Sequence, residues 1–197
     1  MRGAGYTWHT LIGMIFCLCA LGGPGMSAAE ENLLANPGFE DLQGEMPARW
    51  ELFVERQEGA FGRLSDHAFE GQYSVMLHTP LPYAREPANN WSQNVILELG
   101  GKRLQASASI KVKDATEAAL WVQCWRRLPF RLLYTANTGI KQPVYGTRDW
   151  ERVEVIFDVP RDADFLTVRC VLQGTGSAWF DAIELTEAAS PEAPAGP

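Results

Sequence analysis

The sequence predicts an all-β sandwich, and three observations lead to this fold class. Segments that favour extended structure are short, clusters of Gly, Pro, Asn and Asp separate them, and no stretch shows the period of a long helix. Many short strands with such turns are typical of two packed sheets. The predicted strands are residues 49–55, 73–79, 91–99, 104–113, 118–127, 151–159, 165–173 and 178–186.

Two of these segments alternate between apolar and polar side chains, which indicates strands with one buried face. In residues 104–113 the apolar set is Leu104, Ala106, Ala108, Ile110 and Val112. In residues 151–159 it is Val153, Val155, Phe157 and Val159. Two long connections, 80–90 and 128–150, interrupt the strands, and their length favours functional rims over simple turns.

The ends of the chain differ in composition from the domain between them. Residues 1–29 resemble a signal peptide, because the apolar run 11–21 is too short to span a bilayer and Ser27-Ala28-Ala29 is a small-residue cleavage site. An uncleaved anchor is the alternative. The Ala-, Pro- and Glu-rich tail 187–197 is expected to be disordered, which leaves 30–186 as one β-sandwich domain.

Charge and export restrict the possible partners. Loss of Arg2 with the signal would leave 16 basic against 24 acidic side chains, a net charge of −8. An acidic domain is a poor match for nucleic acid or an anionic membrane, so neutral ligands fit better. We expect a secreted or periplasmic protein with no membrane span after signal cleavage.

Residues 118–127 carry the most informative pattern in the chain. Leu120, Val122 and Cys124 point to one side of the predicted strand, while Trp121, Gln123 and Trp125 point to the other. Two indoles around an amide are too apolar for an ordinary wet face and too polar for a core. Indole faces stack on the C–H face of a pyranose, and the two Trp lie about 13 Å apart on one strand. This face is therefore predicted to bind a ligand.

Further polar and aromatic side chains are assigned to the same site. Gln93, Arg169 and Gln173 are expected on the face that carries Trp121, where they would bind hydroxyl groups. Trp91 and Tyr134, in or beside the long connections, are expected to form walls of a groove. The alternative is that some of these aromatic residues pack beneath the loops as additional core.

Catalytic machinery is scarce in the sequence. No H-E-x-x-H or G-x-S-x-G motif, phosphate-binding Gly loop or closely spaced pair of metal-binding cysteines occurs. A pair of carboxylates across a groove would suffice for glycoside hydrolysis, but no Glu or Asp is expected on the Trp121 face. The protein is therefore predicted not to be an enzyme.

Two cysteines, Cys124 and Cys170, remain after signal cleavage, and both share a side with apolar neighbours. In an exported chain this favours one disulfide, if the two strands are adjacent. The alternative is a pair of inert buried thiols.

Two acidic residues lie in apolar surroundings near the two ends of the domain. Asp181 shares parity with Ile183 and Leu185, so its carboxylate should be buried and need a partner, and Glu40 directly follows Phe39. Side by side, two acids and loop carbonyls would suit calcium. The alternative is that Asp181 accepts backbone N–H bonds at a β-bulge.

A chain-long order of short motifs resembles the carbohydrate-binding modules of cellulases and xylanases, of the family four, nine and twenty-two type. The motifs are N-L-L-x-N-P-G-F-E from Asn32, P-A-R-W-E, E-G-Q-Y-S-V, W-S-Q-N-V, the run 101–113, D-W-E-R-V-E-V-I-F and W-F-D-A-I-E-L. The resemblance implies a jelly roll of two antiparallel sheets with a glycan groove on the concave face. It also implies a structural calcium, whose ligands map onto Glu40, Asp181 and a carbonyl near Gly71 and Gln72.

The resulting hypothesis is a secreted, non-catalytic jelly-roll domain that binds an oligo- or polysaccharide. One alternative is an envelope scaffold that uses the same face to bind a protein partner. A small jelly-roll glycoside hydrolase or lyase is a third, less favoured reading.

Overall fold

The computed structural model describes residues 31–188 of the chain. The predicted signal peptide, 1–29, and residues 189–197 of the predicted tail lie outside the described residues. The predicted start of the tail at residue 187 was wrong, because Glu187 is the last residue of β11 and pairs with Leu104. Within 31–188, no helix is long and apolar enough to cross a membrane.

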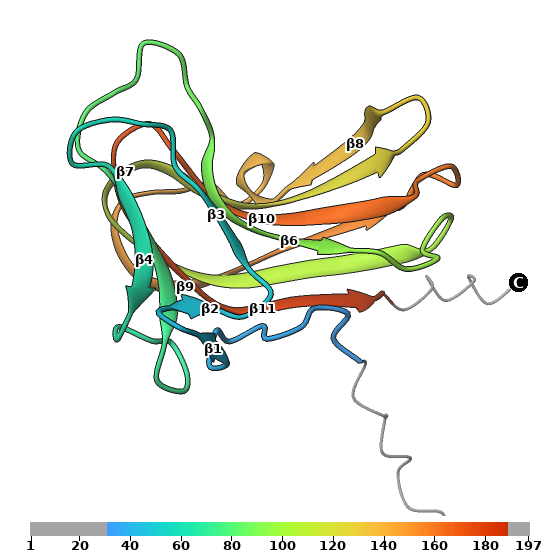
Figure 1. The fold of residues 1–197 in the computed structure, drawn as a ribbon, viewed down its shortest axis with the longest axis horizontal. Helices are drawn as coiled ribbons and strands as arrows, with labels where there is room; N and C mark the ends of the chain where they lie inside the picture. Colours follow the sequence, from blue (N-terminus) through green and yellow to red (C-terminus); the bar gives the residue numbers. More distant parts are fainter. Residues whose placement is uncertain (1–30, 189–197) are drawn as a thin grey trace, which may run out of the picture.

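The fold is a jelly-roll β-sandwich of two antiparallel sheets (Figure 1). One sheet, here called the β9 sheet, contains β4 (Phe61–Ser65), β5 (Ser74–Thr79), β11 (Gly176–Glu187), the first half of β7 (Arg103–Arg126) and β9 (Val144–Asp158). The other, the β10 sheet, contains β3 (Glu51–Phe53), β6 (Asn89–Val95), β10 (Phe165–Gln173), the second half of β7 and β8 (Arg131–Asn137). The hairpin of β1 (Leu42–Gln43) with β2 (Met46–Pro47) and the 3₁₀ turn η1 (Thr138–Ile140) complete the fold. The predicted all-β class is confirmed.

Strand β7 belongs to both sheets because it turns at its middle. Its first half pairs with β11 and β9, its second half with β10 and β8, and the ladder to β9 shifts register between Ile110 and Ala118. Asp114 lies at this turn with a left-handed φ of 51°. The β10–β11 turn crosses so close to it that a Cβ on Gly176, at φ 108°, would lie 2.3 Å from the Asp114 carbonyl oxygen. Only glycine fits there.

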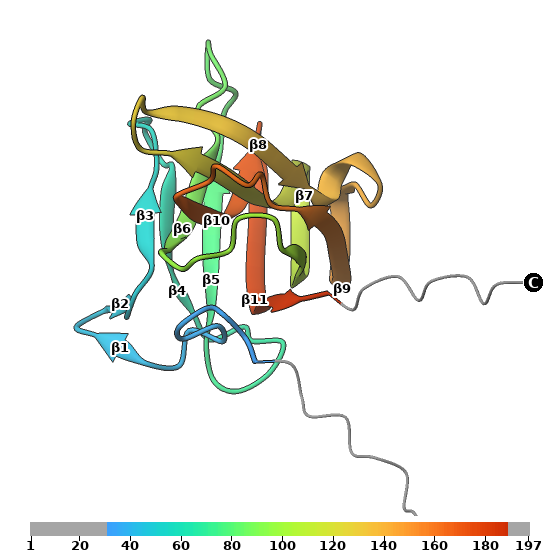
Figure 2. The same cartoon turned by 90° about the vertical axis from the view of Figure 1, so that its right-hand side faces the viewer.

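The core lies between the two sheets and follows the predicted alternation. Leu104, Ala106, Ala108, Ile110 and Val112 are buried, as are Val153, Phe157 and Val159, while Val155 is half-buried. The N-terminal segment closes one side, where the Leu33 N–H donates to the Leu185 carbonyl at 2.8 Å (Figure 2).

Three predicted boundaries were wrong in informative ways. Residues 104–113 and 118–127 form the single strand β7, because its alternation changes at a bend and not at a loop. The predicted connection 128–150 contains β8, η1 and the start of β9. Strand β4 was missed, since Phe61–Ser65 is an edge strand of five residues with a weak apolar pattern.

Candidate functional site

Register places Trp121 on the outer face of the β10 sheet. Trp121 lies opposite Arg169 of β10, which lies opposite Ser92 of β6. The next row along the strands holds Gln123 and Thr167, and the row beyond it holds Trp125 and Phe165. Gln173 follows at the other end of β10, opposite Glu117. Five predicted site residues are therefore brought to one face: Trp121, Gln123, Trp125, Arg169 and Gln173.

The two tryptophans of this face differ in how their rings are used. Trp125 stacks on Phe130, with ring centroids 5.2 Å apart and planes 11° from parallel, and on Phe165 at 6.4 Å and 12°. Among residues 31–188, no aromatic pair includes Trp121, which is half-buried. Within the described residues, Trp121 therefore keeps its ring free of aromatic stacking, whereas Trp125 belongs to an aromatic wall at the β7–β8 end.

Unpaired polar atoms concentrate on the same face. Within 31–188, eight buried side-chain nitrogen or oxygen atoms have no hydrogen-bond partner. Five of them belong to this face: Trp121 Nε1, Gln123 Oε1, Trp125 Nε1, Arg169 Nε and Asn90 Oδ1. Because an unpaired buried polar group costs about 1–3 kcal/mol, this cluster marks a face whose polar groups the described chain does not itself satisfy.

The charge at the centre of the face is Arg169. β10 is the middle strand of the β10 sheet, and burial lowers the pKa of the half-buried guanidinium. The sequence prediction that no acid lies here was wrong, since register places Glu51 beside Ser92 and Glu117 beside Gln173. Sequence reasoning also missed Thr167, which donates to Asn94 Oδ1 at 2.8 Å. Its alternation with Phe165 and Arg169 is the signal that could have found it.

Three predicted site residues do not lie on this face. Trp91 is opposite Cys170, fully buried, and donates through Nε1 to the Met76 carbonyl, so it is a core residue. Gln93 shares the core side with Val168, and its amide binds both the N–H and the carbonyl of Ala35. Tyr134 is opposite Cys124 and stacks on Phe157. Trp91 and Tyr134 were assigned because they lie in or beside the long connections. Gln93 was assigned from the alternation of its strand without knowledge of how that strand pairs with β10.

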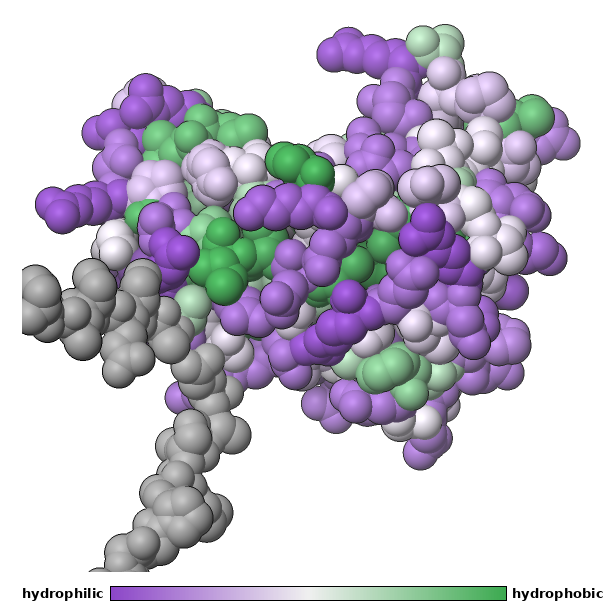
Figure 3. Space-filling view, turned by 180° about the vertical axis from the view of Figure 1, so that it is seen from behind, coloured by the Kyte–Doolittle hydropathy of each residue, from purple (hydrophilic) through white to green (hydrophobic). Residues whose placement is uncertain are grey.

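The molecule has a depression above the outer face of the β10 sheet. In Figure 1 the turn between β7 and β8 rises at one end of the sheet and the connection 80–88 at the other, and Figure 3 shows the dip between them from behind. Exposed apolar side chains mark the β7–β8 end, where Leu128 is 85% and Phe130 69% exposed.

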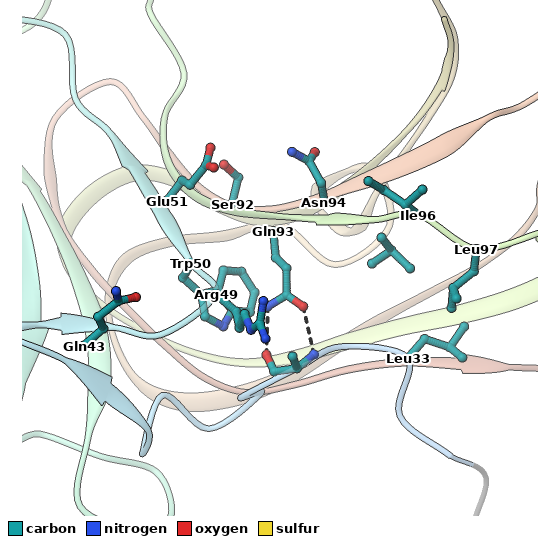
Figure 4. Close-up of a pocket in the computed structure, with 12 residues that line it drawn as sticks. Leu33, Gln43, Arg49, Trp50, Glu51, Ser92, Gln93, Asn94, Ile96 and Leu97 are labelled. Carbon is teal, nitrogen blue, oxygen red and sulfur yellow. Dashed lines mark hydrogen bonds between the residues drawn. The ribbon is translucent and has the colours of Figure 1, made fainter.

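A pocket of about 830 Å³ lies beside β6 and the N-terminal segment, and it shares Glu51, Ser92 and Asn94 with the edge of the Trp121 face (Figure 4). Three of its polar side chains have partners within the chain: Trp50 Nε1 donates to the Asn36 carbonyl at 2.9 Å, Gln93 binds Ala35, and Asn94 accepts from Thr167. None of the eight unpaired atoms lies in it. The Trp121 face is therefore the better candidate.

The predicted disulfide was wrong, and the alternative of two buried thiols is what the structure shows. Cys124 lies opposite Leu166, whereas Cys170 lies opposite Leu120. The cysteines are thus offset by four residues, about 13 Å along neighbouring strands, beyond the reach of a disulfide.

The two acids of the predicted calcium cage both bind the loop before β5. Asp181 is fully buried, and its Oδ2 accepts the N–H groups of Phe69 and Glu70 at 2.8 and 3.1 Å. Its Oδ1 accepts the N–H of Ala182 at a bulge of β11, as the alternative reading expected. The bulge changes the alternation, so Asp181 shares a face with Trp179 and not with Ile183.

Glu40 accepts hydrogen bonds from the other end of this loop. Its Oε1 accepts the N–H groups of Gln72 and Tyr73 at 2.8 and 3.0 Å. Gln72 thus reaches Glu40 through its N–H. Among residues 31–188, neither Glu40 nor Asp181 has a basic partner, and no cluster of three His, Cys, Asp or Glu forms. The oxygens of both carboxylates instead accept backbone N–H groups, four of them from the loop before β5, so calcium at this position stays a prediction.

Comparison with known sequences gives one distant relative and no matching family model. The relative is an uncharacterized HTH-type transcriptional regulator, YbfP, from Bacillus subtilis, 24% identical over 147 residues. The match covers 74% of this chain and 46% of that protein, so the chain spans less than half the length of the relative.

Solved structures share the fold at low sequence identity. The enzymatically active domain of bacteriophage CBA120 tailspike protein 4 superposes with a TM-score of 0.62 and 14% identity, over 80% of this chain and 21% of that one. TmCBM61 in complex with β-1,4-galactotriose gives 0.55 and 16%, over 80% and 99%. The CBM22-1 xylan-binding domain of Paenibacillus barcinonensis Xyn10C gives 0.52 and 13%, over 83% and 100%. The chain therefore has the jelly-roll fold of carbohydrate-binding modules.

Proposed function

We propose that this protein is a secreted or periplasmic, non-catalytic domain that binds a glycan on the outer face of the β10 sheet. One observation carries the proposal: a half-buried Trp121, which stacks on no aromatic ring of the described chain, shares one face with unpaired polar atoms of Gln123, Trp125 and Arg169. A pyranose offers an apolar face to the indole and hydroxyl groups to those polar atoms. The fold shared with galactotriose- and xylan-binding domains supports the same class of ligand.

The proposed binding mode assigns a role to each part of the face. One sugar unit stacks on Trp121, with Gln123 accepting from a hydroxyl and Arg169 donating to one. The wall of Trp125, Phe130 and Phe165 limits the ligand at the β7–β8 end. Gln173 lies about 13 Å from the Trp121 row, which allows contact with a further unit.

The test is a titration of the mature protein with galactotriose, xylohexaose and soluble glucan and mannan oligosaccharides, followed by calorimetry and Trp fluorescence. Trp121→Ala should weaken binding about five- to thirtyfold, because loss of a stacked ring costs on the order of 1–2 kcal/mol. Trp179→Ala is the matched control, since Trp179 also has an unpaired Nε1 but lies on the β9 sheet. No response to any of these sugars, or equal loss in both variants, would contradict the proposal.

The exposed apolar residues Leu128 and Phe130 at the β7–β8 end favour one competing function, the docking of an envelope protein. In that case a stoichiometric partner should be recovered from the envelope fraction, and recovery should fail with Phe130→Ser. A glycan that competes with that partner would place both on the same face.

A further inference from the structure

Arg169 holds an unusual position for a basic side chain. It lies on the middle strand of the β10 sheet, between Ser92 on one side and Trp121 on the other. Its guanidinium is half-buried, and its Nε is buried and unpaired. Holding a partly desolvated cation at the centre of an aromatic face costs free energy that the fold itself does not require.

No acid of the described chain neutralises this charge. Some arginines within 31–188, such as Arg103, Arg126 and Arg152, have carboxylates within 4 Å, and among the described arginines without one only Arg169 has a buried, unpaired nitrogen. Of the acids on its face, Glu51 lies two strands away, about 10 Å, and Glu117 lies about 13 Å along the sheet from the Trp121 row. Burial also lowers the pKa of Arg169, as expected where an anion is missing.

The chemistry of the guanidinium and of its neighbour together identify a ligand class. Arginine binds carboxylates through two parallel N–H donors, and such charge-assisted bonds are about twice as strong as those to hydroxyl groups. The indole of Trp121 lies in the adjacent register position. A hexuronic acid unit offers both matching features, an apolar ring face and a carboxylate on the ring edge.

We propose that the glycan recognised here is acidic: the carboxylate of a uronic acid unit binds Arg169 while a sugar ring stacks on Trp121. This inference rests on the proposed function and names its ligand class. Because the chain carries a net charge of −7, long-range attraction does not favour an anion. Selectivity for the acid must therefore come from the local contact with Arg169.

The experiment compares each acidic sugar with its uncharged methyl ester, which keeps the same sugar backbone. Calorimetry is carried out with trigalacturonate and trimannuronate, each against its fully methyl-esterified form, on the mature protein and on Arg169→Gln, Arg169→Lys and Arg63→Gln. We expect at least one acid to bind about tenfold or more tightly than its ester. Arg169→Gln should bring the two affinities together, and Arg169→Lys should keep part of the preference, since it retains the charge without the planar fork.

Arg63→Gln is the matched control, because it removes an exposed arginine from the β9 sheet and should leave the preference intact. Equal affinity for acid and ester in both pairs, or a preference that persists in Arg169→Gln, would overturn the inference. If galactotriose or xylohexaose then still binds in a Trp121-dependent manner, the proposed function stands and only its acidic specificity fails. If no sugar binds, both fail.

Discussion

Cys124 and Cys170 lie on neighbouring strands of the same sheet and on the same core side, yet four residues out of register. Both are fully buried. An exported chain with two inward-facing cysteines invites a disulfide, but the ladder between β7 and β10 pairs each of them with a leucine.

We therefore expect both thiols to be free and unreactive in the folded protein. Iodoacetamide at neutral pH should modify neither cysteine until denaturant is added, when both should react. Mass spectrometry of the non-reduced protein provides the measurement. A mass lower by two hydrogen atoms, or reaction of the native protein, would contradict the register.

The Cys124 thiol also makes stability depend on alkaline pH. Burial raises its pKa from 9.0 to about 12, so between these values the unfolded chain releases a proton that the folded chain keeps. The stability from this group is complete below pH 9 and is lost as the pH rises toward 12. Denaturant unfolding from pH 8 to 11 should show a steeper decline for the wild type than for Cys124→Ala. Parallel curves would show that the thiol does not contribute.

Asp181 is expected to hold the loop before β5 to the bulge of β11. Its two oxygens together accept three backbone N–H groups, from Phe69, Glu70 and Ala182. Asp181→Asn would turn an amide NH₂ toward at least one of these donors, at a cost of about 1–3 kcal/mol. Thermal unfolding should show a lowered Tm. Asp158→Asn, which changes an exposed acid of β9, should have almost no effect.

Calcium bound by Glu40 and Asp181 remains a proposal with its own test. Chelation should lower the Tm of the wild type and leave that of Asp181→Ala unchanged, because a ligand of the folded state alone stabilises it. Adding calcium back should restore the difference, and magnesium should do so poorly. Equal shifts in both proteins would remove Asp181 from the set of calcium ligands.

Gly176 is expected to be the least replaceable glycine at the bend of β7. Both Gly176 and Gly146 have left-handed φ angles, 108° and 74°, but only Gly176 is crowded, whereas a Cβ on Gly146 would meet nothing within 4 Å. Gly146→Ala should cost about 1 kcal/mol and Gly176→Ala more than about 3 kcal/mol. Similar losses in urea unfolding would show that backbone conformation alone, and not the approach to Asp114, sets the requirement.

The fold could be predicted from sequence where apolar alternation was regular. Residues 165–173 match β10 at both ends, and the inward set from Leu104 to Val112 is buried as predicted. The bend of β7 could not be predicted, because Asp114 and Ala115 look like a loop when the crossing turn at Gly176 is unknown. Strand β8 was hidden for a related reason: as an edge strand with exposed Leu132 and Tyr134, it lacks a clear alternation.

In the candidate site, too, relations within one strand could be predicted from the sequence, whereas relations between strands could not. Trp121, Gln123 and Trp125 were assigned correctly to one face, because their relation depends on one strand alone. The errors at Trp91, Gln93 and Tyr134 came from pairing strands without knowing their register. That Trp125 is stacked by Phe130 while Trp121 is not depends on a hairpin that the sequence did not reveal.

The continuity of β7 couples the unfolding of the two sheets. Since 24 residues of one strand are hydrogen-bonded into both sheets, neither sheet can separate without loosening the strand that the other requires. Amide hydrogens of β10 and β11 should therefore exchange through the same opening event, with similar free energies. A partly melted molecule that keeps its Trp121 face while losing the β9 sheet is not an available state.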